Sequence, residues 1–327
     1  MIIIIPFFDF FGNERFVENH YAAQKKLNES GCKCFTYEAI LKTQQAPRIE
    51  AIEDNMHMHV VVKDVMWHKE RMINLAVKHL DDIGYKDDDV MWIDSGCYIN
   101  KTAIKKVKSA LNEVPFVQPF SNVCYQDQLG EGWEREVPSA AYQRRMNSDK
   151  HGAPGGAWAM RREFFQSACE GLYDRLIVGS ADQVFSDSIL LGKPRAQLLP
   201  DGLARDNVND WHRKLQSDYP TTPWKVIGTN LIHLWHMHTE NRKVHERMDA
   251  VLHANFDPAK WLDTDKNGMY YWTKIAKGTP KGRRFVRYCD QYLAGRHKPV
   301  VVKEIVVPEE PVLHQAKRSN SGLHLWS

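Results

Sequence analysis

The stretch Ile2-Ile3-Ile4-Ile5-Pro6-Phe7-Phe8-Asp9 is a continuous run of β-branched and aromatic side chains that ends in a carboxylate. Such a run, without alternation of apolar and polar residues, is typical of a strand that is buried on both faces of a parallel sheet. The amphipathic segment Glu14–Leu27 then predicts a helix, which we expect to stop before Gly31. We interpret this strand and helix as the first unit of an α/β fold.

The same alternation of apolar runs and amphipathic segments continues along the chain. Strands are expected at Cys32–Tyr37, His59–Lys63, Asp89–Ile93, Val114–Phe120 and Gly155–Met160. Helices are expected at Trp67–Leu80, Asn100–Leu111, Arg161–Cys169 and Ala181–Leu191. This order predicts an open α/β sheet with right-handed crossovers. The polar region Ser121–Pro154 carries few strand signals, and we expect it to be a long functional loop.

The composition excludes several classes of protein. The chain has 327 residues, of which 43% are hydrophobic, and its 44 Lys and Arg nearly balance 41 Asp and Glu, which excludes disordered and collagen-like chains. No stretch approaches the ~18–20 apolar residues that span a bilayer, and Met1–Phe8 is too short for a secretory signal. The six cysteines lack zinc-binding and CxxC spacing, so we expect reduced thiols in a bacterial or infected-host cytoplasm.

The loop Pro6–Gly12 and the turn Asp94–Gly96 each follow a predicted strand. Ligands of open α/β sheets bind at the carboxyl ends of the strands, so these segments are expected to form the mouth of a site. A carboxylate such as Asp94 at a strand end can bind ribose hydroxyls or a divalent metal through its oxygens. A site in which negative charge develops on a leaving group also needs cations or hydrogen-bond donors.

Four segments carry the residue types that such chemistry requires. In chain order they are Trp67–Asn74, Trp92–Cys97, Gly155–Glu163 with Gly179–Gln183 after it, and His233–His238. Together they resemble the family-2-type glycosyltransferases of the GT-A fold, in particular a bacterial and phage group related to galactosyltransferases. The resemblance covers roughly residues 1–272 and implies an open mixed sheet flanked by helices. It also implies transfer of a sugar from a nucleotide-diphosphate sugar, with a UDP-sugar favoured, to a hydroxyl acceptor.

The resemblance implies a role for individual residues. Asp182 would be the general base, which favours an inverting reaction, and helix N-capping is the alternative for this residue. Donor-binding residues would be Pro6, Asp9, Lys69, Asn74, Asp94, Gly156 and Trp158. Local structural roles remain open for several of these: a turn for Asp9, a local hydrogen bond for Asn74 and core packing for Trp158.

A metal site is the least regular part of the resemblance. Gly96 occupies the position of the second carboxylate of the family's DxD motif, which puts the usual Mn²⁺ or Mg²⁺ arrangement in doubt. The remaining metal ligands implied are Asp94, His236 and His238. On a strand His236 and His238 would share a face, with His233 pointing away. Packing of these histidines in the core is the alternative.

The C-terminal part differs in charge from the rest. Residues 274–298 contain eight Lys and Arg against Asp290 alone, with Phe285, Tyr288 and Tyr292 spaced along one helical face. We therefore divide the chain into a transferase domain (1–272), a basic helical appendage (273–298) and an extended tail (299–327). Clustered basic groups favour a polyanionic partner. The preferred acceptor is a hydroxymethylated pyrimidine base of phage DNA; alternatives are a cell-surface polysaccharide or glycan, and a nucleotide-sugar-binding protein without transfer activity.

Overall fold

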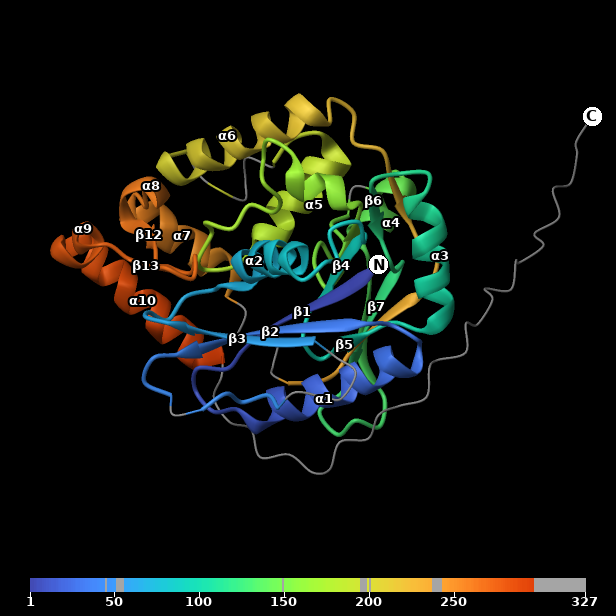
Figure 1. Cartoon of the computed structure of the whole chain (residues 1–327). Coiled ribbons are helices and arrows are strands. Elements are labelled where there is room, and N and C mark those ends of the chain that lie inside the picture. Colours follow the sequence, from blue (N-terminus) through green and yellow to red (C-terminus); the bar gives the residue numbers. More distant parts are fainter. Residues whose placement is uncertain are drawn as a thin grey trace, which may run out of the picture.

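The computed structural model describes residues 1–44, 46–50, 56–148, 150–194, 199, 201–236 and 243–296. Their centre is a seven-stranded mixed sheet with the order β10-β6-β9-β4-β1-β2-β3 (Figure 1). These strands are β1 (Ile2–Phe8), β2 (Cys34–Leu41), β3 (Met56–Val62), β4 (Val90–Ile93), β6 (Phe116–Gln118), β9 (Ala157–Met160) and β10 (Trp224–Val226). All pair in parallel except β9, which runs antiparallel between β4 and β6. The predicted mixed α/β sheet is confirmed.

Strand β1 lies inside this sheet, between β4 and β2, and is buried on both faces, as its sequence predicts. Ile2 and Ile4 belong to one hydrophobic cluster, whereas Ile3 and Ile5 belong to a second cluster, and all four are at most 2% exposed. This follows from the two-residue period of a strand, which sends alternate side chains to opposite faces. Apolar burial of both faces is the main source of stability in such a sheet.

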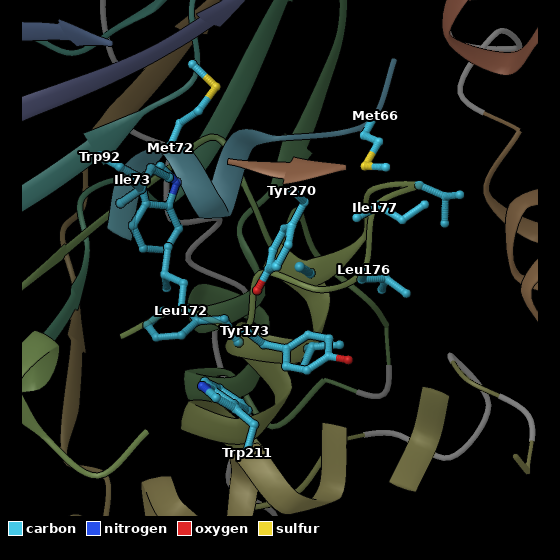
Figure 2. Close-up of a cluster of buried hydrophobic side chains, with 14 of the residues drawn as sticks. Met66, Met72, Ile73, Trp92, Leu172, Tyr173, Leu176, Ile177, Trp211 and Tyr270 are labelled. Carbon is cyan, nitrogen blue, oxygen red and sulfur yellow. The ribbon is translucent and has the colours of Figure 1, made fainter. Parts of the chain in front are cut away.

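Helices cover both faces of the sheet. Apolar residues of α1 (Glu14–Glu29) and α3 (Lys101–Leu111) pack in the cluster of Ile3, whereas those of α2 (Lys69–Asp82) and α5 (Ala181–Leu191) pack in the cluster of Ile2. The predicted cap of α3 is present, because the Asn100 side chain accepts a hydrogen bond from the amide of Ala103 at 2.8 Å. Figure 2 shows Met72 and Ile73 of α2 beside Trp92 of β4 in this core.

The prediction of a long loop over residues 121–154 is wrong. The region contains β7 (Asn122–Gln126), β8 (Trp133–Pro138) and α4 (Ala140–Arg145). Strands β7 and β8 belong to a second sheet, with the order β5-β11-β7-β8, in which β5 (Cys97–Tyr98) and β11 (Asn230–His233) are the other members. The pairing of β7 with β11 joins segments about 100 residues apart, so it stabilises a strand whose own sequence has a weak signal.

A second correction concerns the segment after β9. Residues Arg162–Gln166 form the short 3₁₀ helix η1 instead of the expected α-helix Arg161–Cys169. The backbone amide of Arg161 is bonded to Pro115 (3.1 Å), which ties this point of the chain to the start of β6.

The C-terminal part adds more helices at one side of the sheet (Figure 1). Its elements are α6 (Leu203–Asp218), α7 (Val244–Ala254), α8 (Pro258–Trp261), β12 (Leu262–Thr264), β13 (Tyr270–Trp272), α9 (Lys274–Gly278) and α10 (Pro280–Arg296). Phe285 of α10 is buried against Phe256 and Trp272, with ring centroids 5.1 and 5.8 Å apart, while Arg283, Arg284 and Arg287 are exposed. Helix α10 therefore packs by its aromatic face, and the boundary at residue 272 stays a prediction.

Two further features concern the helices and the cysteines. Within the described ranges, no helix combines the length and the apolar character needed to cross a membrane. None of the six cysteines, all of which lie in described segments, forms a disulfide. The expected tail, residues 299–327, lies outside the described residues.

Two buried histidines make the folded state sensitive to acid. Burial lowers the pKa of His20 to about 3 and that of His68 to about 4. The unfolded chain therefore takes up protons near pH 6.5 that the folded chain refuses, so stability is lost as the pH falls from about 6.5 toward 4. Each histidine is expected to contribute about 1.4 kcal/mol per pH unit to this loss.

Urea unfolding at several pH values measures this loss. His20→Gln is expected to reduce the slope of the free energy of unfolding against pH by the contribution of one proton. The matched change His253→Asn, at an exposed site, is expected to leave this slope unchanged. An unaltered slope in His20→Gln would contradict the assignment.

Candidate active site

A cavity of about 650 Å³ lies at the edge of the main sheet where β1 and β4 end. Pro6 and Phe8 of β1, and Asp94 just after β4, line it. Because β9 is antiparallel to both strands, its preceding residues Gly155 and Gly156 lie at the same edge. The second sheet forms another wall through residues such as Tyr125. The site therefore lies where the strand order of the sequence predicts it.

The lining of the cavity includes the ammonium group of Lys69, at the start of α2. Its Nζ lies 3.0 Å from Oδ1 of Asp94 and 3.8 Å from Oδ2 of Asp182, at the start of α5. Burial alone would lower the pKa of Lys69, which is 4% exposed, but Asp94, Asp182 and Glu70 together raise it above its ordinary value. Lys69 is therefore a permanent cation that holds two carboxylates in one cavity.

Asp182 is held in one orientation by its surroundings. Its Oδ1 accepts a hydrogen bond from the backbone amide of Gln183 at 2.9 Å. Its Oδ2 lies directly against Gly155, where a Cβ atom would be only 2.1 Å from that oxygen. Ser180, immediately before α5, has the left-handed φ of +77° and turns the chain into the helix. Asp182 thus presents one carboxylate oxygen to the space above the Gly155 backbone.

Glu70 is a further charged partner of Lys69, on α2. It was not identified from the sequence as a site residue. Its Oε1 lies 3.7 Å from Lys69 Nζ, and its Oε2 accepts a hydrogen bond from the indole of Trp67 at 3.2 Å. Burial raises the pKa of Glu70 to about 7, although Lys69 acts in the opposite direction. A glutamate next to a lysine on a helix carries no signal of this kind in sequence, because surface helices have many such pairs.

The structure brings together six of the predicted site residues: Pro6, Lys69, Asp94, Gly156, Asp182 and His236 all line the cavity. Asp9, Asn74 and Trp158 do not line it. His238 lies outside the described residues.

The three residues away from the cavity have other partners in the fold. Asp9 Oδ2 lies 3.5 Å from Arg48 Nε. The Asn74 side chain bonds both the carbonyl and the amide of Leu172, at 2.9 and 3.0 Å. Trp158 donates its indole N–H to the carbonyl of Pro154 at 2.8 Å, and its ring is fully buried. The full burial of Trp158 agrees with the core alternative. The partner of Asn74 lies 98 residues away, so its hydrogen bonds are not the local bond that the sequence left open.

The expected arrangement of the histidines is wrong. Strand β11 ends at His233, so the alternation of a strand does not extend to His236. The rings of His233 and His236 stack on each other with centroids 4.9 Å apart, instead of pointing away from one another. Tyr125 lies against His233 and Phe16 against His236, with centroids 4.8 and 5.0 Å apart. The two histidines therefore form part of an aromatic wall.

The described donor groups do not fit a divalent metal. Asp94 Oδ1 is bonded to the Lys69 ammonium, which competes with a cation for the same oxygen. Gly96, at the position of the second carboxylate, has a φ of +81°, a conformation that strains any residue with a side chain. Within the described part of the chain, no group of three or more His, Cys, Asp or Glu side chains could hold a metal ion.

Cationic side chains outnumber carboxylates in the lining of the cavity. They are Lys69, Arg135, Lys243, Arg247 and Arg296, against the carboxylates of Asp94 and Asp182. Arg247 comes from α7 and Arg296 from the end of α10, so the C-terminal helices form one wall. The sequence placed Arg296 in a basic stretch, but only the packing of α10 brings it to the cavity. The surplus of positive charge favours an anionic ligand.

Comparisons with known proteins give only distant similarity. No family model and no curated protein matches the chain. The structure of S. aureus TarS 1–349 is 11% identical with a TM-score of 0.41, covering 78% of this chain and 65% of that one. This chain thus spans about two thirds of the TarS fragment.

Two structures of Drosophila β1,4-galactosyltransferase 7 are also similar. The catalytic domain in complex with xylobiose is 11% identical with a TM-score of 0.36, covering 86% of this chain and 98% of that one. A mutant in complex with manganese, UDP-Gal and xylobiose is 12% identical with a TM-score of 0.33, covering 58% and 61%. At TM-scores of 0.33–0.41, none of these similarities assigns a ligand or a residue role to this chain.

Removal of the central ammonium is expected to destabilise the fold. Lys69→Met leaves Asp94 and Asp182 facing each other without a cation and is expected to lower the free energy of unfolding by about 2 kcal/mol, measured by urea unfolding. Adding Asp94→Asn to Lys69→Met is expected to cost about 1 kcal/mol less than the sum of the single changes, because the two residues interact directly.

The control is Lys225→Met, which breaks an exposed ion pair with Glu113 and is expected to change stability by less than about 0.5 kcal/mol. Equal effects of Lys69→Met and Lys225→Met would show that the central ion pairs carry no special weight.

Proposed function

We propose that this protein is a glycosyltransferase of the GT-A type, which transfers a sugar from a nucleotide-diphosphate sugar to a hydroxyl acceptor. One observation carries the proposal: the ammonium of Lys69 holds the carboxylates of Asp94 and Asp182 in a single cavity whose lining has a surplus of cationic groups. A sugar donor of this kind is anionic, whereas its reaction needs a carboxylate base. The cavity offers both, and its volume of about 650 Å³ suits a ligand of that size.

The donor would lie along the edge formed by β1 and β4. Asp94 would accept hydrogen bonds from the ribose hydroxyls, and Lys69 would fix the orientation of that carboxylate. Pro6 and Gly156 would allow close approach of the donor, since neither projects a large polar side chain into the cavity. Lys69 would act on the nucleotide through Asp94. A UDP-sugar is the favoured donor, on the basis of the sequence resemblance.

Asp182 would act as general base in an inverting reaction. Its Oδ2 would take the proton of the acceptor hydroxyl while the hydroxyl oxygen attacks the anomeric carbon. The bond between that carbon and the diphosphate oxygen breaks at the same time, and its electron pair leaves with the nucleoside diphosphate. Gly155 keeps the space in front of Oδ2 open, because any side chain there would collide with the carboxylate.

A divalent metal is implied by the resemblance, although the described donors do not fit one. Mn²⁺ or Mg²⁺ would supply positive charge to the leaving diphosphate when bound, with Asp94, His236 and His238 as its implied ligands. The steps above use the side chains of the protein alone. Turnover with EDTA and with added Mn²⁺ separates the two possibilities.

For the acceptor we propose a polyanion, with a hydroxymethylated pyrimidine base of phage DNA as the first choice. Helix α10 exposes Arg283, Arg284 and Arg287 and ends at Arg296 in the cavity lining, so its basic face leads toward the site. A base in a duplex would have to flip out to reach Asp182. A cell-surface polysaccharide or glycan is the second choice, and nucleotide-sugar binding without transfer is the third.

The decisive variant for transfer is Asp182→Asn. It is expected to lower turnover of a UDP-sugar by two to four orders of magnitude and to leave donor affinity nearly unchanged, because only proton removal is lost. Release of nucleoside diphosphate measures turnover, and calorimetry measures affinity. Asp206→Asn, at an exposed carboxylate of α6, is the matched control. Normal turnover by Asp182→Asn would refute the base assignment, and donor binding without any turnover would favour the third choice.

The acceptor proposal is tested by the triple change of Arg283, Arg284 and Arg287 to Ser. It is expected to raise the KM for hydroxymethylcytosine-containing DNA and to weaken the salt dependence, because each lost phosphate contact lowers the logarithmic slope by about 0.9. Donor KM is expected to stay the same. The control changes Lys101, Lys105 and Lys108, exposed lysines of α3, to Ser. Turnover with glycans and none with DNA would reject the DNA acceptor.

A further inference from the structure

The N-terminus of α5 opens toward the wall that the C-terminal helices form. Gly179 and Ser180 both have left-handed φ values, +86° and +77°, and the Ser180 side chain makes no capping hydrogen bond. Helix α5 has eleven residues, so its N-terminus carries the usual partial positive charge. This charge favours an anion, and the first turn already carries the carboxylate of Asp182, whose Oδ1 accepts a hydrogen bond from the amide of Gln183. A helix end alone is common, however, and the neighbouring arginine is what distinguishes this one.

Arg247 is buried beside this helix end, at 5% exposure. Its Nη1 donates to the carbonyl of Val178 at 2.6 Å, and it lies so close to Gly179 that a Cβ there would be 2.5 Å away. Among the described residues, its Nε has no hydrogen-bond partner. A buried guanidinium with an unused donor is costly unless a negative group completes it. The turn at Gly179 thus packs against the guanidinium of Arg247, which lacks a full set of hydrogen-bond partners among the described residues.

A second arginine approaches the same wall from α10. Arg296 lies over the ring of Trp67, with its guanidinium carbon 4.7 Å from the ring centroid, and it donates to the hydroxyl of Tyr292 at 2.8 Å. The guanidinium of Arg247 lies 5.3 Å from the ring of the same tyrosine. Tyr292 therefore links the two arginines. Lys243, at the start of α7, also lines the cavity.

We propose that Arg247, Arg296 and the N-terminus of α5 form a phosphate site that holds the diphosphate of the donor without a divalent metal. This inference rests on the proposed function, because it names the part of the donor that this wall binds. When the glycosidic bond breaks, the diphosphate oxygen receives the electron pair, and its negative charge grows where these cations lie. The described donor groups do not fit a divalent metal, which agrees with this proposal. The protein would supply the positive charge from its own side chains.

The test is calorimetry in EDTA with three probes: inorganic pyrophosphate, UDP and uridine. Wild-type protein is expected to bind pyrophosphate and UDP, and to bind uridine at least tenfold more weakly than UDP. Arg247→Met and Arg296→Met are each expected to weaken UDP tenfold or more without changing uridine. Arg213→Met, at an exposed arginine of α6 outside the cavity, is the control. Thermal unfolding verifies the fold; Arg296, which is only partly buried, serves if Arg247→Met is unstable.

The inference is overturned if UDP binds only after Mn²⁺ or Mg²⁺ is added, or if both arginine variants bind UDP as tightly as wild type. Its failure is distinguishable from failure of the proposed function. Tight binding of UDP and pyrophosphate in EDTA, without transfer from any sugar donor, would support the phosphate site and reject the transferase. Transfer that needs a metal and ignores Arg247 and Arg296 would do the reverse.

Discussion

The candidate site depends on the ion pairs that the buried ammonium of Lys69 makes. This ammonium joins the end of β4, the first turn of α2 and the first turn of α5 through Asp94, Glu70 and Asp182. A charge this far from water must be paired, and three carboxyl groups this close to each other must share a cation. The ion pairs of Lys69 therefore hold the elements around the cavity together, in addition to the apolar packing that stabilises the rest of the sheet.

Antiparallel β9 gives that ionic centre its surroundings. In a fully parallel sheet, the residues before β9 would lie at the opposite edge, far from Asp94. The reversed strand instead brings Gly155 and Gly156 to the cavity, where their small size makes room for Asp182 on one side and for Leu231 on the other. Glycine is required at Gly156 for a second reason, its φ of +91°. The antiparallel direction of β9 thus places two small residues in the lining of the cavity.

The sequence predicted what depends on local pattern. Apolar runs such as Ile2–Ile5 and amphipathic segments predicted most strands and helices of the first half, and the strand ends located the cavity. The pairing of β7 with β11 was missed because it is non-local. The face of His236 was wrong because nothing in the sequence marks the end of β11 at His233. Arg247 reaches the cavity through tertiary packing, so its sequence position gives no signal.

The C-terminal helices have a consequence for the order in which the molecule is made. The first 182 residues contain β1, β4 and β9 together with Lys69 and the two carboxylates. The wall that carries Arg247 and Arg296 needs α7 and the last turn of α10. Domains fold from the N-terminus during synthesis. A growing chain therefore contains six of the seven strands of the main sheet and the residues of the ion pairs early, while the opposite wall forms only after residue 296 has been synthesised. Competence would then be acquired late, as the final helix docks.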